Sequence, residues 1–153
     1  LAEELFGHIP LIYGEFGYLG VIAERWKDQI NENSKVIAYN NVLPELNHNE
    51  VVGWELPEEL AEVFSVVLLR DEDANIRYQL RAEVTRQLVA MKGCGVAEVW
   101  AQGESRLAKP LTTMHFGDWV SIYLAAMYGV DPSSIDNIKL LKAKLAEAGP
   151  VKF

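Results

Sequence analysis

The 153-residue sequence contains one cysteine and only three histidines. Cys94 cannot form an internal disulfide, and a chain without disulfides is typical of the cytoplasm, where we expect this protein. His8, His48 and His115 do not cluster with cysteines or with one another, so the spacings typical of transition-metal sites are missing. We therefore expect neither a metal ion nor another cofactor.

Long apolar runs and an excess of basic residues are also missing. Apolar stretches such as Phe64–Leu69 fall far short of the ~20 residues that span a bilayer. The chain has 22 acidic and 14 basic residues, a net charge of −8, so no basic surface for nucleic acid is predicted. We expect neither a membrane nor a nucleic-acid partner, and an anionic substrate would need cations or N–H groups supplied locally or from outside this chain.

Short apolar segments alternate with helical periodicity along the chain. Predicted strands are Ile9–Tyr13, Val36–Tyr39, Val63–Leu69 and Val96–Ala101. Predicted helices cover 19–30, 44–52, 75–91, 105–128 with a break near Gly117, and 133–146; the third carries Ile76, Leu80, Val84 and Leu88 on one stripe. This alternation predicts one α/β domain over residues 1–153, a three-layer αβα sandwich with a mainly parallel sheet flanked by helices.

The first strand-to-helix turn contains Gly14, Gly17 and Gly20. Their spacing differs from the G-x-G-x-x-G fingerprint of dinucleotide-binding domains, and Glu15 would repel a phosphate. A tight turn is therefore the simpler interpretation, and a nucleotide-binding domain is disfavoured.

Two polar motifs lie on either side of the predicted second strand. Asn31-Glu32-Asn33-Ser34-Lys35 precedes it, where polar residues are the ordinary content of a connection. Pro44-Glu45-Leu46-Asn47-His48-Asn49-Glu50 follows it and places two asparagines around a histidine in a predicted helix, where asparagine is a poor helix former. Composition alone assigns neither motif a catalytic role.

Together these motifs strongly resemble the second sugar-isomerase (SIS) domain of archaeal and bacterial bifunctional phosphoglucose/phosphomannose isomerases. The resemblance runs from about Ile9 to Leu145, and the segment from Glu32 to His48 is its most diagnostic part. Further matching stretches are Arg25-Trp26-Lys27, Gly53-Trp54, Leu69-Arg70-Asp71, Gly103-Glu104-Ser105-Arg106-Leu107, Gly117–Ala125 and Gly129-Val130-Asp131-Pro132.

The resemblance implies interconversion of glucose 6-phosphate and mannose 6-phosphate with fructose 6-phosphate, without a metal. It implies that Glu32 is the catalytic base and that His48 takes part in opening the sugar ring. A lysine near the C-terminus belongs to the family's site; Lys142 is our first candidate and Lys139 the second. We also expect Asn31, Asn33 and Asn47 to contact the substrate.

The resemblance further implies a longer polypeptide, a homodimer and a shared site. The family's N-terminal SIS domain carries a Gly/Ser-rich loop that grips the sugar phosphate, and this chain has no such loop. Because Glu32 precedes a strand and His48 follows it, one copy is not expected to bring both to one substrate, so the partner subunit would supply one of them. The alternative is a non-catalytic SIS module that binds a sugar phosphate for regulation or assembly.

Overall fold

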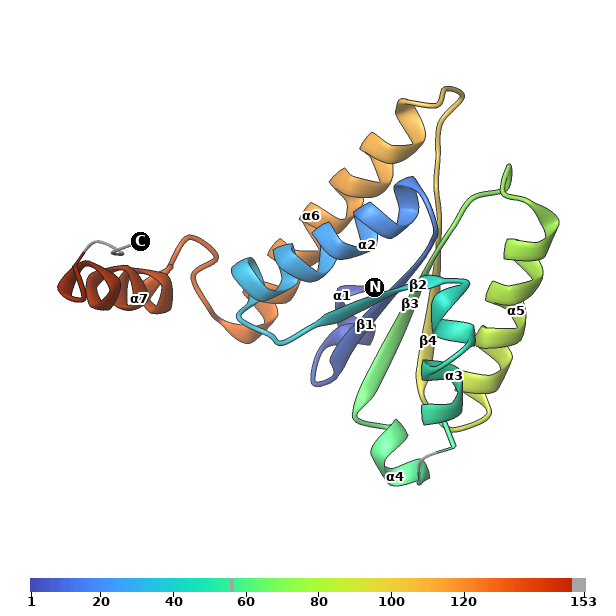
Figure 1. Cartoon of the computed structure of the whole chain (residues 1–153), viewed down its shortest axis with the longest axis horizontal. Helices are drawn as coiled ribbons and strands as arrows, with labels where there is room; N and C mark the ends of the chain where they lie inside the picture. The colour runs from blue at the N-terminus through green and yellow to red at the C-terminus, as the bar shows by residue number, and fades with distance from the viewer. Residues whose placement is uncertain (56, 150–153) are drawn as a thin grey trace.

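The structure, a computed structural model, describes residues 1–55 and 57–149. Its elements in chain order are α1 (Ala2–Leu5), β1 (Ile9–Glu15), α2 (Tyr18–Gln29), the π-helix η1 (Ile30–Ser34), β2 (Tyr39–Leu43), the 3₁₀ turn η2 (Glu45–Asn47), α3 (Glu50–Gly53), α4 (Glu58–Ala61), β3 (Phe64–Arg70), α5 (Ile76–Ala90), β4 (Gly95–Trp100), α6 (Ala108–Tyr128) and α7 (Asp136–Glu147). The strands form a parallel sheet in the order β2-β1-β3-β4. Figure 1 shows α2 and α6 on one face of this sheet and α3 and α5 on the other, which confirms the three-layer α/β fold.

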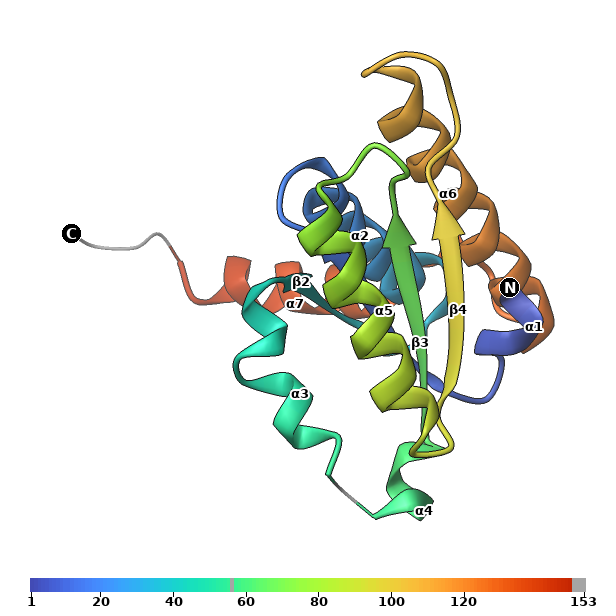
Figure 2. The same cartoon turned by 90° about the vertical axis from the view of Figure 1, so that its right-hand side faces the viewer.

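The core is divided by the sheet into two clusters. In β3, Val67 and Leu69 pack into the cluster beneath α2 and α6, whereas Val66 and Leu68 pack into the cluster beneath α3 and α5. Successive side chains of a strand point to opposite faces, so a strand covered on both faces is apolar throughout. This explains the uninterrupted apolar run that the sequence shows here; Figure 2 shows β3 between the two helical layers.

The second strand lies later than predicted. The expected strand Val36–Tyr39 is wrong, because pairing with β1 begins at Tyr39, opposite Leu11, and continues to Leu43. The Asn31 side chain holds the preceding residues out of the ladder: its Oδ1 accepts a hydrogen bond from the Ala38 backbone N–H at 3.3 Å.

The predicted helix from Pro44 to Val52 is also wrong. The segment forms η2 and then the single-turn helix α3. Asn47 turns its amide to Thr85 of α5, and the Asn49 side chain accepts a hydrogen bond from the Glu50 N–H at 2.6 Å. These side-chain bonds compete with the backbone bonds of a continuous helix.

The predicted break near Gly117 is absent, since α6 is continuous from Ala108 to Tyr128. Gly117 instead admits the indole of Trp26: a Cβ added at this glycine would lie 2.2 Å from the indole Nε1. This close approach brings α2 and α6 together over the sheet.

The predicted apolar stripe of α5 does not face the sheet. Ile76 is 73% and Leu80 is 62% exposed, and Val84 and Leu88 are exposed as well. The residues that α5 buries are Ala82, Thr85 and Val89.

The last helix, α7, extends away from the layered body (Figure 1). Its residues are exposed throughout, including Ile138, Leu141 and Leu145, which recur at helical spacing. The chain before it is held to η1, because the Lys35 ammonium donates hydrogen bonds to the carbonyls of Ser134 at 2.7 Å and Pro132 at 3.4 Å.

Candidate active site

Glu32 lies exposed in the π-helix that continues α2. The turn around it is fixed by its neighbours. The Asn31 amide donates to the Lys27 carbonyl at 2.8 Å, and the Lys35 ammonium donates to the carbonyl of Glu32 itself at 2.5 Å. Single π turns within helices frequently occur at functional sites. The carboxylate is thus presented to solvent from a backbone with many hydrogen bonds.

The same turn is joined to α6 through Ser121, which is fully buried. Asn33 Nδ2 donates to Ser121 Oγ and also to Gln29 Oε1, both at 2.8 Å. The buried Ser34 hydroxyl donates to the Ser121 carbonyl at 2.8 Å. The residues on both sides of Glu32 are therefore anchored to protein groups.

Glu32 lines a shallow hollow of about 380 Å³ on the surface of α2. Two further carboxylates, of Glu24 and Asp28, line it. Arg25, the one cation among the described residues that line it, already pairs with Asp118 of α6 at 3.2 Å. An anionic sugar phosphate would be repelled by this group of carboxylates, so its phosphate needs positive or N–H groups from another part of the assembly.

His48 is exposed between η2 and α3, and its ring has no hydrogen-bond partner among the described residues. Its loop is nevertheless anchored. Glu50 accepts hydrogen bonds from the Tyr13 hydroxyl and the Asn41 amide in the sheet, and Asn47 donates to Thr85 Oγ1 of α5 at 2.7 Å. The imidazole is therefore held on a fixed loop and faces solvent.

Glu32 and His48 lie beyond opposite ends of β2. Glu32 precedes the first residue of this strand, and His48 follows the last, Leu43. A five-residue strand separates its ends by roughly 13 Å or more. The strand thus still intervenes between the two residues, although it lies at 39–43 rather than 36–39.

The three asparagines expected to contact substrate already have protein partners. Asn31 and Asn33 bond within the Glu32 turn and to α6, and Asn47 bonds to α5. Each side chain is partly buried rather than fully enclosed. Their part in substrate binding stays a prediction, whereas their part in holding the Glu32 and His48 segments is visible in the structure.

The two candidate lysines both lie on the projecting helix α7. Lys139 pairs with Asp136 at 3.3 Å, whereas Lys142 makes no ion pair within residues 1–55 and 57–149. Neither contacts Glu32 or His48 in the described structure. A role for Lys142 stays a prediction.

The chain order reverses between β1 and β3, and open α/β sheets usually bind ligands at the carboxyl ends of such strands. Here protein side chains meet at that point: Asp71 accepts hydrogen bonds from the Tyr18 hydroxyl and the Lys109 ammonium, both at 2.5 Å. The turn after β1 is tight, because a Cβ at Gly14 would lie 2.3 Å from the Leu19 carbonyl oxygen.

Glu15 ends β1 at this same place and is only 6% exposed. One of its carboxylate oxygens has no hydrogen-bond partner among the described residues. Burial raises the pKa of Glu15 to about 7; the Arg70 guanidinium opposes the shift, and Asp71 adds to it. This buried acid belongs to the sheet rather than to the Glu32 turn.

Within residues 1–55 and 57–149, no three or more His, Cys, Asp or Glu side chains are grouped so that they could hold a metal ion. No helix in that part of the chain has both the length and the apolar character needed to cross a membrane.

A family model described as the bacterial phospho-glucose isomerase C-terminal SIS domain matches residues 1–145. The chain belongs to this family. A bifunctional phosphoglucose/phosphomannose isomerase from Caldicellulosiruptor bescii is 45% identical to this SIS domain over 147 residues, which are 96% of this chain and 43% of that protein. One from Aquifex aeolicus is 41% identical over 145 residues, which are 95% of this chain and 45% of that protein.

Solved structures agree on the fold. A glucose-6-phosphate isomerase-like protein from Thermus thermophilus superimposes with a TM-score of 0.71, over 88% of this chain and 44% of that one. At 24% identity this likeness supports the SIS fold alone. In each of these comparisons the SIS domain spans less than half of the related chain.

Two supporting residues were not identified as site residues from the sequence. Lys35 ties the Glu32 turn to the segment before α7, and Ser121 ties it to α6. Lys35 has a left-handed backbone with φ of 59°, which its sequence position did not indicate. The signal for Ser121 was a small polar residue inside an otherwise apolar helical stretch, a signal that many helices share.

Proposed function

We propose that this domain is the C-terminal half of a cytoplasmic isomerase that interconverts glucose 6-phosphate and mannose 6-phosphate with fructose 6-phosphate. The observation that carries the proposal is the Glu32 carboxylate, exposed on a turn whose adjacent residues, Asn33 and Ser34, are both bonded to the buried Ser121. The similarity to bifunctional phosphoglucose/phosphomannose isomerases over 95–96% of the chain supports it.

In this proposal Glu32 removes the proton from C2 of the open-chain aldose and the electrons form a cis-enediol. O1 takes up a proton from solvent as the enediol forms. The same carboxylic acid then returns the carbon-bound proton to C1 while O2 releases its proton to solvent, which yields the ketose without an external oxidant or reductant. One carboxylate suffices because C1 and C2 are adjacent. Glucose and mannose phosphates differ only at C2, so rotation about C2–C3 in a roomy site presents either C2 proton to the same base.

The cyclic sugar must open before the base can act. His48 transfers the proton that ring opening requires, and Lys142 stabilises the oxyanion that develops. Because Glu32 and His48 lie beyond opposite ends of β2, His48 of the partner subunit serves the Glu32 of this one. The phosphate is held by an N-terminal SIS domain, since the hollow beside Glu32 is lined by carboxylates.

Subunit complementation tests the shared site. Glu32→Gln and His48→Gln enzymes are prepared separately as full-length proteins, and each is expected to be inactive. After mixing and subunit exchange, half of the dimers are mixed, and one of the two sites in each contains both native residues. The expected activity is about a quarter of the wild-type value. No recovery in a mixture whose subunits demonstrably exchange would overturn the shared site.

A second candidate is a non-catalytic SIS module that binds a sugar phosphate for regulation or assembly. The acidic hollow and the missing phosphate loop favour it for this chain taken alone. Sugar-phosphate binding by the full-length protein, without exchange of the C1 or C2 proton with solvent, would select this alternative.

A further inference from the structure

The outer side of α6 exposes an apolar and aromatic surface, which we call the α6 stripe. Its members recur every three or four residues and so lie on one side of the helix. They are Phe116, Trp119, Tyr123 and Met127, which are 46%, 50%, 60% and 39% exposed. Trp119 and Tyr123 have ring centroids 6.0 Å apart, and the Trp119 indole already donates to His115 Nε2 at 3.0 Å. The exposed aromatic surface is therefore continuous, and the indole N–H has a partner within the chain.

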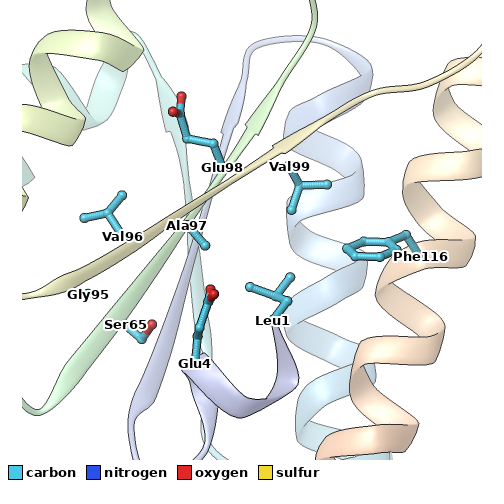
Figure 3. A pocket seen from close by; sticks show the side chains of 9 residues that line it. All are labelled: Leu1, Glu4, Ser65, Gly95, Val96, Ala97, Glu98, Val99 and Phe116. Carbon is cyan, nitrogen blue, oxygen red and sulfur yellow. The ribbon is translucent and has the colours of Figure 1, made fainter.

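Two hollows lie along this stripe and join. One, of about 530 Å³, is lined by the stripe residues together with Leu1 and Ala2. The other, of about 590 Å³, lies between Leu1, Phe116 and the strand β4 from Gly95 to Val99 (Figure 3). Leu1 and Phe116 line both hollows, so the two form one concave surface.

This surface has the composition of an interface. Aromatic residues and methionine are enriched where proteins bind one another, and contiguous apolar patches of this kind are uncommon on the free surface of a monomer. The strand β4 ends the described sheet and contributes its length to the same concavity. A folded partner, rather than a small polar ligand, fits such a surface.

We infer that an N-terminal SIS domain of the same polypeptide covers the α6 stripe; this rests on the proposed function. The related isomerases are more than twice as long as the part that this chain matches, and the matching family model is that of the C-terminal SIS domain.

The position of Glu32 supports the same occupant. Helix α6 bonds to the Glu32 turn through Ser121, and Asp118 of α6 pairs with Arg25, which lines the hollow into which Glu32 opens. A domain seated on α6 therefore lies beside the helix that holds the Glu32 turn. That is where a domain that lends the phosphate-binding groups has to lie.

Thiol labelling of the full-length enzyme tests this inference without using activity. Tyr123→Cys and Met127→Cys report on the stripe, and Glu59→Cys on the exposed surface of α4 is the matched control. The native Cys94 is buried, so it should contribute little background labelling in the folded protein. Each rate is divided by the rate of the same variant unfolded in guanidinium chloride, and circular dichroism checks that each variant is folded.

We expect both stripe cysteines to react at least about tenfold more slowly than the α4 cysteine, at every protein concentration, because an attached domain does not dissociate on dilution. Equal rates would overturn the inference. So would protection that is lost on dilution, since a second copy would then be the occupant. Loss of isomerisation in Glu32→Gln is measured independently, so this inference and the proposed function can fail separately.

Discussion

The amide of Asn33 donates a hydrogen bond of 2.8 Å to the hydroxyl of Ser121, a residue 88 positions further along the chain. This bond makes the turn that carries Glu32 part of the α6 packing. A base that abstracts a proton from carbon must be held at a fixed position relative to the substrate. Small changes in the α6 contacts should therefore affect chemistry as well as stability.

Ser34→Ala should show both effects. The substitution removes a buried hydroxyl and leaves the Ser121 carbonyl without its side-chain donor. We expect the free energy of unfolding to fall by about 1–2 kcal/mol and kcat to fall more than KM rises, because the turn that orients Glu32 loosens. Urea denaturation and steady-state kinetics measure the two. Asn40→Ala is the control, since that side chain makes no hydrogen bond among the described residues; equal kinetics in the two variants would contradict the argument.

Gly117→Ala tests the close contact of α2 with α6. The added methyl would lie 2.2 Å from the Trp26 indole, whose N–H donates to the Thr113 carbonyl at 3.0 Å. We expect destabilisation by about 3 kcal/mol, because a buried indole has little room to move.

Gly53→Ala is the control for that variant, because nothing lies within 4 Å of a Cβ at that position. Its free energy of unfolding should change by less than about 1 kcal/mol. Similar effects of the two alanines in thermal or urea melts would show that the Trp26 contact does not matter.

Glu15 should make the stability depend on pH. Its folded-state pKa of about 7 lies above the ordinary value of 4.5, so between these pH values the folded state keeps a proton that the unfolded state has lost. Stability is therefore fully present below about pH 4.5, falls as the pH rises through about 7, and then levels off.

Glu15→Gln removes that titration. Relative to the wild type, the variant should gain about 3 kcal/mol between pH 4.5, where the two are about equally stable, and pH 8. Urea denaturation across this range measures the difference. A wild-type stability that rises between pH 5 and 7 in parallel with that of the variant would show that Glu15 ionises freely in the folded protein.

Much of the scaffold could be predicted from the sequence because its pattern follows directly from burial. The apolar run around Val66 and Val67 predicts a strand covered on both faces, and the alternation of such runs with helical periodicity predicts the parallel sheet. These signals are local in the chain and do not depend on any particular long-range contact.

The predictions from sequence are wrong where long-range contacts or polar side chains determine the local structure. The spacing of apolar residues on α5 does not reveal that Ile76 and Leu80 face solvent. An exposed apolar stripe has the same helical period as one that packs against the sheet. The start of β2 depends on an Asn31 side-chain bond, and the shape of the His48 loop depends on Asn47 and Asn49. Helix and strand propensities describe backbone preferences and do not take these side-chain hydrogen bonds into account.

The candidate site was predicted from motif resemblance rather than from geometry. The structure places Glu32 and His48 on separate anchored turns beyond opposite ends of β2. That they meet in a site shared by two subunits stays a prediction. The sequence could not indicate Lys35 or Ser121 as supports, since their contacts lie about 90 to 100 residues away along the chain.

Proton exchange at the sugar carbons tests the role of Glu32. Full-length wild type, Glu32→Gln and the control Glu24→Gln, which lines the same hollow, are incubated in D₂O with fructose 6-phosphate, and deuterium incorporation at C1 and C2 is followed by NMR. We expect wild type and Glu24→Gln to exchange at similar rates, and Glu32→Gln to be slower by about a thousandfold while it still binds the sugar phosphate. Exchange at the wild-type rate in Glu32→Gln would show that another group moves the proton.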